Sequence, residues 1–132
     1  MKFLLDTHAL LWAVEAPERL PSSLRRTLAR PEQLPYGVAA ISLWEIGMLE
    51  AKGRLLLPCP LLEWFRRHVR APFAEVVPLG PEVAADAVHL PGDFHGDPAD
   101  RLIVATARSH ELTIVTADRR IRAWRHVRSL WE

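Results

Sequence analysis

The stretch HGDPADRLIVATA, residues 95–107, decides the fold. It predicts a loop that leads into a helix, because Asp97 is a good N-cap residue and Pro98 suits the first helical position. The apolar residues that follow predict a buried helix. Asp97 and Asp100 are three residues apart, so their carboxylates are expected together at the N-terminal end of this helix. Two carboxylates at that place could form either an ordinary helix start or a metal site.

Short apolar runs alternate with helical segments on both sides of this stretch. The expected strands are residues 2–5, 36–41, 74–78, 112–115 and 126–130, and the expected helices are residues 7–14, 22–30, 42–52, 61–70, 81–89, 97–110 and a short turn at 117–123. Proline and glycine residues end several of these segments, as is typical of element boundaries. The alternation predicts a single α/β domain over residues 1–132, with a mainly parallel sheet and helices on both faces.

Composition excludes several classes of protein. The chain has 132 residues, of which 49% are hydrophobic and 25% are charged, as in ordinary globular proteins. No apolar run approaches the roughly 18 residues of a membrane span, and Asp6 comes too early for a signal peptide. The single Cys59 rules out an internal disulfide and a cysteine-based zinc site. We therefore expect a cytoplasmic protein with no membrane segment.

The net charge is only +1, but the arginines are clustered. They gather at residues 25–30, 66–70 and 119–128. Such clusters could contact the phosphates of a nucleic acid, although a solvated helix face is the commoner explanation. Charge alone therefore does not identify a partner.

The acidic residues fall at one place in the expected fold. Four of the six aspartates and one glutamate lie just after an expected strand or in the first turn of an expected helix: Asp6, Glu45, Asp97, Asp100 and Asp118. In a parallel sheet these positions share one edge, which is where ligands bind. Carboxylates gathered there repel one another, and a divalent cation relieves that repulsion. Hard oxygen ligands without cysteine suit Mg²⁺ or Mn²⁺, which support attack by water on a phosphodiester.

Each acid also has an ordinary structural explanation. Ser42 and Glu45 fit a capping box, in which the glutamate only satisfies a backbone N–H at the helix start. Asp97 and Asp118 could each be no more than an N-cap. Asp6 is the hardest to explain in this way, because a carboxylate at the end of a buried strand is costly unless it is paired or liganded. Capping can explain each acid separately, but it does not explain why all of them fall at one edge of the expected sheet.

Four segments of the chain resemble the PIN domain family, and in particular the VapC-like toxins of bacterial toxin–antitoxin pairs. The segments are LLDTHALLW at 4–12, SLWEI at 42–46, HGDPADRLIVA at 95–105 and IVTAD at 114–118. Each segment is a weak signal alone, and the strength of the resemblance lies in their order and spacing over nearly the whole chain. The resemblance implies a three-layer α/β/α PIN-like fold with a parallel sheet of four or five strands.

The resemblance also implies a Mg²⁺- or Mn²⁺-dependent endoribonuclease. Carried over by position, the acidic quartet is Asp6, Glu45, Asp100 and Asp118. Of these, Asp6, Asp100 and Asp118 are expected to hold the principal metal ion. Thr7 and Thr116 match hydroxyl positions that help to order the acids or bound water. Asp97 is an additional acid of the subgroup with this Asp-Pro-x-Asp-Arg run, and it could ligate the metal or only cap the helix.

Family members are commonly homodimers, and their usual partner is a small antitoxin that inserts a segment into the active-site groove. RNA, an antitoxin and a second copy of the chain are therefore the partners that the resemblance implies. The arginine clusters near Arg66 and Arg119 are expected to steer the RNA.

Two other functions stay open at this point. An inactive relative could act only through a protein partner, which the intact acidic quartet disfavours. A phosphoacceptor domain of flavodoxin-like fold also places acids at strand ends, but it would usually have a paired acid after the first strand and a late lysine. Here Asp6 is followed by Thr7, and the lysines are Lys2 and Lys52.

Several other residues carry weaker signals. Arg101 is expected to pair with Asp97, four residues earlier on the helix. His8 and His95 adjoin the acids and could contact phosphate, although lone histidines are more often simple polar contacts. Trp12 and Trp44 lie on expected helices rich in leucine, so we expect them to serve in core or dimer packing rather than in base stacking.

Overall fold

The structure, a computed structural model, describes residues 1–94 and 96–132. The strands are β1 (Phe3–Leu5), β2 (Tyr36–Ala39), β3 (Ala74–Val77), β4 (Thr113–Val115) and β5 (Ser129–Leu130). The helices are α1 (Thr7–Glu15), α2 (Ser22–Leu28), α3 (Ala40–Ala51), α4 (Leu61–His68), α5 (Pro81–Val88), α6 (Pro98–Ser109) and α7 (Arg119–Ala123). Every expected element is present, with ends that differ by a few residues. Two short 3₁₀ helices that were not expected, Pro17–Arg19 and Pro31–Gln33, each begin at a proline.

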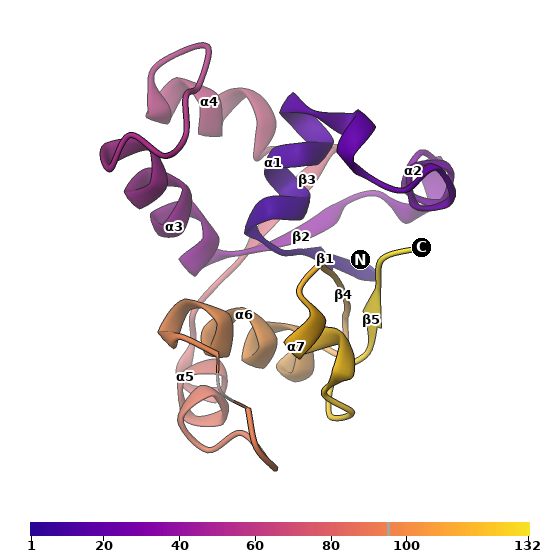
Figure 1. The fold of residues 1–132 in the computed structure, drawn as a ribbon, viewed down its shortest axis with the longest axis vertical. Coiled ribbons are helices and arrows are strands. Elements are labelled where there is room, and N and C mark those ends of the chain that lie inside the picture. Colours follow the sequence, from indigo (N-terminus) through magenta and orange to yellow (C-terminus); the bar gives the residue numbers. More distant parts are fainter. Residues whose placement is uncertain (95) are drawn as a thin grey trace.

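The five strands form one parallel sheet in the order β3-β2-β1-β4-β5. From the central β1 the chain moves outward through β2 and β3, and then returns past β1 to β4 and the edge strand β5 (Figure 1). The strand order therefore reverses between β1 and β4, and a crevice is expected beyond the carboxyl ends of these two strands.

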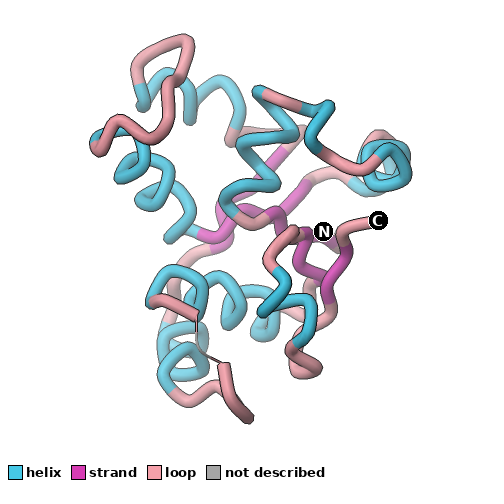
Figure 2. The backbone as a smooth tube through the Cα atoms, in the orientation of Figure 1, coloured by secondary structure: helices cyan, strands magenta, loops and turns pink. Residues whose placement is uncertain are grey.

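Helices cover both faces of the sheet. Successive residues of a strand point to opposite faces, so Phe3 and Leu5 belong to one hydrophobic cluster and Leu4 belongs to the other. The first cluster includes residues of α1 to α4, and the second includes residues of α5 to α7. Figures 1 and 2 show these two groups of helices on opposite sides of the strands. The predicted three-layer α/β/α fold with a parallel sheet of four or five strands is confirmed, and the sheet has five.

Helix α6 is the buried helix that the sequence predicts. Its residues from Ile103 to Ala107 are at most 2% exposed. Arg108 fixes its far end, because Nε lies 2.8 Å from Asp86 Oδ2 on α5 and Nη1 donates to the His126 carbonyl at 2.7 Å. Helix α6 is therefore held firmly in place, and so are the residues at its start. No helix in the described part of the chain is both long and apolar enough to cross a membrane.

Helix α3 begins earlier than predicted. Its first residue is Ala40 and its N-cap is Ala39, with no hydrogen bond from a capping side chain. Strand β2 runs directly into the helix, so Ser42 lies inside the first turn, where it is fully buried. Interpreting Ser42 and Glu45 as a capping box is therefore wrong. Glu45 falls in the second turn of α3, which leaves its carboxylate available for another contact.

Candidate active site

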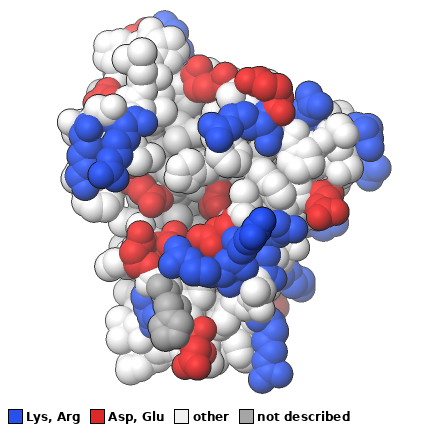
Figure 3. All heavy atoms as spheres, viewed as in Figure 1, with Lys and Arg blue, Asp and Glu red and all other residues white. Residues whose placement is uncertain are grey.

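The five acids that the sequence singles out line one cavity. They are Asp6, Glu45, Asp97, Asp100 and Asp118, and the cavity has a volume of about 430 Å³. It lies beyond the carboxyl ends of β1 and β4, where the strand order reverses. Figure 3 shows acidic atoms gathered in the middle of this face, beside a band of Lys and Arg atoms.

Three of these acids are N-caps, so helix starts fix their positions. Asp6, Asp97 and Asp118 cap α1, α6 and α7. In each case Oδ1 accepts a hydrogen bond of 2.8 Å from a backbone N–H two or three residues later. Capping uses one carboxylate oxygen and leaves the other for further contacts. The same three residues can therefore cap helices and still offer an oxygen to a metal ion.

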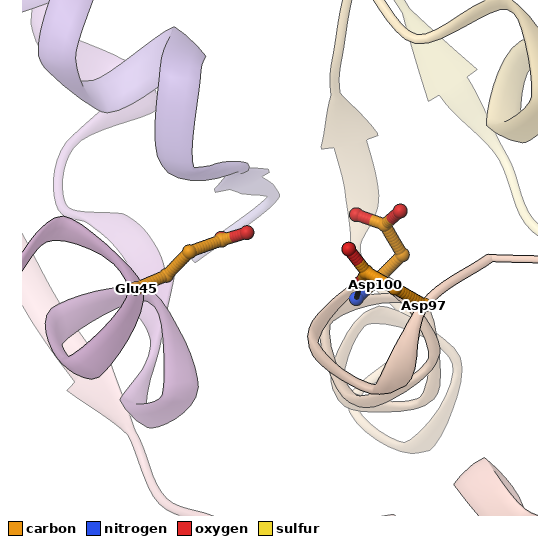
Figure 4. A group of neighbouring side chains, drawn as sticks. All are labelled: Glu45, Asp97 and Asp100. Atoms are coloured by element: carbon orange, nitrogen blue, oxygen red, sulfur yellow. Dashed lines mark hydrogen bonds between the residues drawn. The ribbon is translucent and has the colours of Figure 1, made fainter. Parts of the chain in front are cut away.

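The tightest acidic group within the described residues is Glu45, Asp97 and Asp100. Each offers one carboxylate oxygen, and these oxygens lie within 4.8 Å of one another. Figure 4 shows Glu45 reaching from α3 toward the start of α6, where Asp97 and Asp100 lie. Oxygen donors at this spacing fit a hard divalent cation such as Mg²⁺ or Mn²⁺. Asp6 and Asp118 line the same cavity outside this group.

Two buried hydroxyl groups hold acids of the site. Thr7 Oγ1 donates to Glu45 Oε1 and lies 3.1 Å from the Ser42 hydroxyl. The side chain of Thr116 is hydrogen-bonded to Asp6, and its Oγ1 accepts from the Asp118 backbone N–H at 3.0 Å. Both threonines thus orient acids from other parts of the chain. Sequence reasoning missed the role of Ser42, whose only signal was its place beside Glu45.

Burial, with the charges of neighbouring carboxylates, raises the pKa of two carboxyl groups. Burial first, and then the charges of three neighbouring carboxylates, raise the pKa of Asp100 to about 6, while Arg120 opposes the shift. Burial also raises the pKa of Asp6, against hydrogen bonds from Thr116 and the Ala9 N–H and the nearby charge of His8. The acids are therefore held close together at an electrostatic cost that a divalent cation would remove.

The Arg120 guanidinium lies among these acids. Its Nη2 is 3.4 Å from Asp100 Oδ2 and 3.5 Å from Asp118 Oδ2. The sequence places Arg120 only within a general arginine cluster, and its position two residues after the last acid was the signal available.

Arg101 does not pair with Asp97, so that prediction is wrong. Its Nε donates to the Ala87 carbonyl at 2.9 Å, and its Nη1 donates to the Phe94 carbonyl at 2.8 Å. These carbonyls lie at the end of α5 and in the loop before α6, where helical partners are missing. Arg101 thus fastens the loop that leads into the site.

Aromatic side chains flank the acids on one side. Trp12 and His8 both line the cavity, and their ring centroids are 5.7 Å apart. Trp12 also contacts Trp131 at 5.7 Å between centroids. The contact with Trp131 agrees with the packing role expected for Trp12, but Trp12 also lines the cavity. His95 lies outside the described residues, so the expectation for it has no structural counterpart.

Gly96 permits a close approach between the loop and α6. A Cβ atom there would lie 2.5 Å from Phe94 Cε1 and 2.8 Å from Asp100 Cβ. Phe94 is buried against Trp124, with 5.1 Å between ring centroids, so it has little room to move. Gly96 therefore helps to set where Asp100 sits.

We expect Gly96→Ala to destabilise the protein by about 1–3 kcal/mol, because the added methyl group must displace Phe94 or the first turn of α6. Urea or thermal unfolding measures this loss. Gly80→Ala is the matched control, since its Cβ would lie 3.7 Å from Glu82 Oε2, an ordinary contact. Equal losses in the two variants would contradict the prediction.

Comparison with known proteins agrees with the fold. A model of the PIN domain family matches residues 3–127. The chain is 43% identical to Ribonuclease VapC22 of Mycobacterium tuberculosis over 128 residues, which cover 95% of this chain and 93% of that protein.

Solved structures with the same fold include two complexes. VapBC from Salmonella typhimurium, bound to DNA, has a TM-score of 0.73 at 20% identity, with 98% of this chain and 97% of that chain covered. VapBC2 from Rickettsia felis, bound to a DNA fragment from their promoter, has a TM-score of 0.70 at 17% identity, with 98% of each chain covered. These likenesses concern the fold. Together with the family match and the 43% identity, they show that the chain belongs to the PIN domain family, among its VapC-like members.

Proposed function

We propose that this chain is a Mg²⁺- or Mn²⁺-dependent endoribonuclease that hydrolyses RNA phosphodiester bonds, and that it is the toxin of a type II toxin–antitoxin pair. The observation that carries the proposal is the convergence of five carboxylates in one cavity of a PIN domain. A relative at 43% identity is named as a ribonuclease, which supports the same activity here. We further propose that residues 1–132 act as a single domain in the cytoplasm.

Carboxylate oxygens would hold the metal. Glu45, Asp97 and Asp100 supply the close group of donors, and Asp6 and Asp118 complete the surroundings of the ion from the same cavity. Bound there, Mg²⁺ or Mn²⁺ would activate water and neutralise the charge that develops on the phosphate. From the sequence, Asp6, Asp100 and Asp118 are expected to hold the metal ion. We instead place Glu45 and Asp97 beside Asp100 as the closest metal ligands.

The remaining side chains prepare this chemistry. Thr7 engages Glu45 Oε1, so we expect Glu45 Oε2 to be the oxygen that this residue offers to the metal ion. Thr116 orients Asp6, and its hydrogen bond to the carboxylate favours the charged form, although burial still raises the pKa of Asp6. The basic band beside the cavity would attract the RNA backbone.

We also propose a small antitoxin as partner and a homodimer as the assembly. Structures of similar fold include one titled a toxin–antitoxin complex from Klebsiella pneumoniae, with a TM-score of 0.64 at 17% identity. A hollow of about 380 Å³ next to the acids is lined by Trp44, Leu49 and Asp97, among others. Trp44 is 59% exposed, which suits a protein contact. An antitoxin arginine would pair well with the cavity carboxylates.

The test of the proposed activity is RNA cleavage by the purified chain in Mn²⁺, in Mg²⁺ and in excess EDTA. We expect cleavage with either metal and none in EDTA, because each step needs the cation. The ends of the cut RNA show which sequence is recognised, and single-stranded DNA of the same sequence tests selectivity. A folded protein that binds Mn²⁺ but cleaves nothing would favour an inactive binding module.

A further inference from the structure

Two tryptophan rings lie between the acidic cavity and a second hollow. Trp12, on α1, lines the acidic cavity. Trp131, which follows β5, lines a hollow of about 630 Å³ together with residues of α7. The two rings are in contact, with 5.7 Å between their centroids. A ligand that extends from the acids in this direction would therefore pass over aromatic surface before it reaches the second hollow.

The ring of Trp12 is held by its neighbours but still faces the cavity. The guanidinium carbon of Arg19 lies over the ring, 4.3 Å from its centroid, which is a cation–π contact. His8 and Trp131 both contact the ring, but neither is stacked flat on it, because the interplanar angles are 54° and 59°. Part of Trp12 lines the cavity beside the acids. Its orientation is therefore fixed, and a further planar group can reach it from the cavity.

The second hollow differs from the acidic cavity in its charge. Arg119 and Arg122 of α7 line it, with Glu132 as an acidic neighbour. Arg122 Nη2 lies 3.5 Å from Glu132 Oε1, and the glutamate side chain is 81% exposed, so this ion pair is weak. Figure 3 shows Lys and Arg atoms over α7, beside the acids. The second hollow therefore suits the phosphates of a strand rather than a metal ion.

Aromatic rings next to basic side chains are typical of sites that bind single-stranded nucleic acids. The bases stack on the rings, and the basic side chains contact the backbone. The bases of a double helix are stacked on one another and are not available to such rings. A basic protein segment would suit the acids, but it would be repelled by Arg119 and Arg122. A single strand of RNA fits both the rings and the second hollow.

We propose that Trp12 and Trp131 form a stacking site for nucleotides next to the bond that is cut, and that the RNA strand continues into the hollow lined by Arg119 and Arg122. The inference rests on the proposed ribonuclease function. It makes the substrate a single strand at this position. It also adds a base-binding role to the packing role that the sequence predicts for Trp12.

The experiment compares two strands that differ only in their bases. One is a fluorescein-labelled oligoadenylate RNA of about 10 nucleotides, and the other is a labelled ribose-phosphate strand of the same length without bases. Fluorescence anisotropy gives both affinities in CaCl₂, since oxygen ligands also bind Ca²⁺, and a gel checks that the RNA stays intact. We expect the wild type to bind the RNA about 5- to 100-fold more tightly than the strand without bases.

Three variants separate base stacking from phosphate binding. Trp12→Leu keeps an apolar side chain but removes the ring, so it should lose about 5- to 50-fold in affinity for the RNA and none for the strand without bases. Trp12→Phe should restore most of the affinity for the RNA, because it restores an aromatic ring. Arg119→Ala should weaken the binding of both strands by the same factor, because a phosphate contact does not depend on the base.

Phe73→Ala is the control for the loss of an aromatic contact. The ring of Phe73 contacts that of Tyr36, with 5.5 Å between centroids, and Phe73 directly precedes β3. It therefore lies at the opposite edge of the parallel sheet from the acids. Phe73→Ala should lower the unfolding temperature but leave both affinities as in the wild type.

Several outcomes would overturn the inference. Equal binding of the two strands by the wild type would show that no base is bound. A Trp12→Leu protein that keeps the full preference for RNA, or that weakens both strands equally, would show that the ring serves only in packing. A wild type that prefers RNA in this way but cleaves none with Mn²⁺ would contradict the ribonuclease function and leave the stacking site in place.

Discussion

Asp6→Asn is expected to reduce metal-dependent RNA cleavage at least about 10³-fold while the fold is kept. Asp6 follows the central strand and lines the cavity with the other acids. The variant loses a negative charge and one of the carboxylate oxygens that we propose surround the metal ion. The asparagine oxygen can still accept the hydrogen bond from the Ala9 N–H, so the cap of α1 survives.

Asp86→Asn is the matched control for this loss. Asp86 lies outside the cavity and pairs with Arg108, whose Nε is 2.8 Å from Asp86 Oδ2. The control should lose some stability and keep its cleavage rate, which is the reverse of the Asp6 result. Cleavage rates, circular dichroism and thermal unfolding of both variants give the comparison. Full activity of Asp6→Asn would contradict the assignment of the site.

The second large effect is expected from Asp100→Asn, which should lose metal binding but gain stability when no metal is present. In the folded protein the pKa of Asp100 is raised to about 6 from the ordinary 3.8. An acid with a raised pKa binds more protons in the folded state, so stability falls as pH rises through that interval. Asparagine carries no charge and escapes this loss.

The expected magnitude follows from the same shift. Because solvent screens this half-buried group, we expect the pKa shift to lower the free energy of unfolding of the wild type by about 1–2 kcal/mol. In EDTA the variant should therefore be more stable than the wild type by that amount at pH 7.5, and equal to it near pH 4. Adding Mn²⁺ at pH 7.5 should raise the unfolding temperature of the wild type and have much less effect on the variant.

Thermal unfolding at the two pH values, with and without Mn²⁺, checks both the gain in stability without metal and the smaller stabilisation by Mn²⁺. Asp86→Asn again serves as the control, because it keeps the cavity intact and should respond to Mn²⁺ as the wild type does. A lower stability of Asp100→Asn at both pH values, or an equal gain from Mn²⁺ in both proteins, would contradict the prediction.

The fold and the common edge of the acids could be predicted from the sequence for one physical reason. Apolar runs such as residues 2–5 and 112–115 can only be buried as strands between helices, and parallel strands place all their carboxyl ends at one edge. Asp6 and Asp118 follow from this rule without any knowledge of side-chain contacts. The cap at Asp97 follows from local chemistry, because Asp followed by Pro is typical of a helix start.

The errors share a different cause. Arg101 was expected to bind its neighbour on the helix, but its guanidinium reaches carbonyl groups on another helix and a loop. Ser42 was expected at a helix start, but strand β2 continues into α3 without a loop, so the hydroxyl meets Thr7 instead. Arg120 turns toward acids from two elements. These contacts depend on how elements that are distant in the sequence pack together, and a local sequence pattern does not predict that packing.

The capping role of Asp6, Asp97 and Asp118 has an evolutionary consequence. Each carboxylate stabilises a helix start that asparagine or serine would stabilise about as well. A single such replacement can therefore abolish the chemistry at almost no cost to folding. In a lineage released from selection for cleavage, the acids would drift to neutral caps while the fold persists. This chain has aspartate at all three positions.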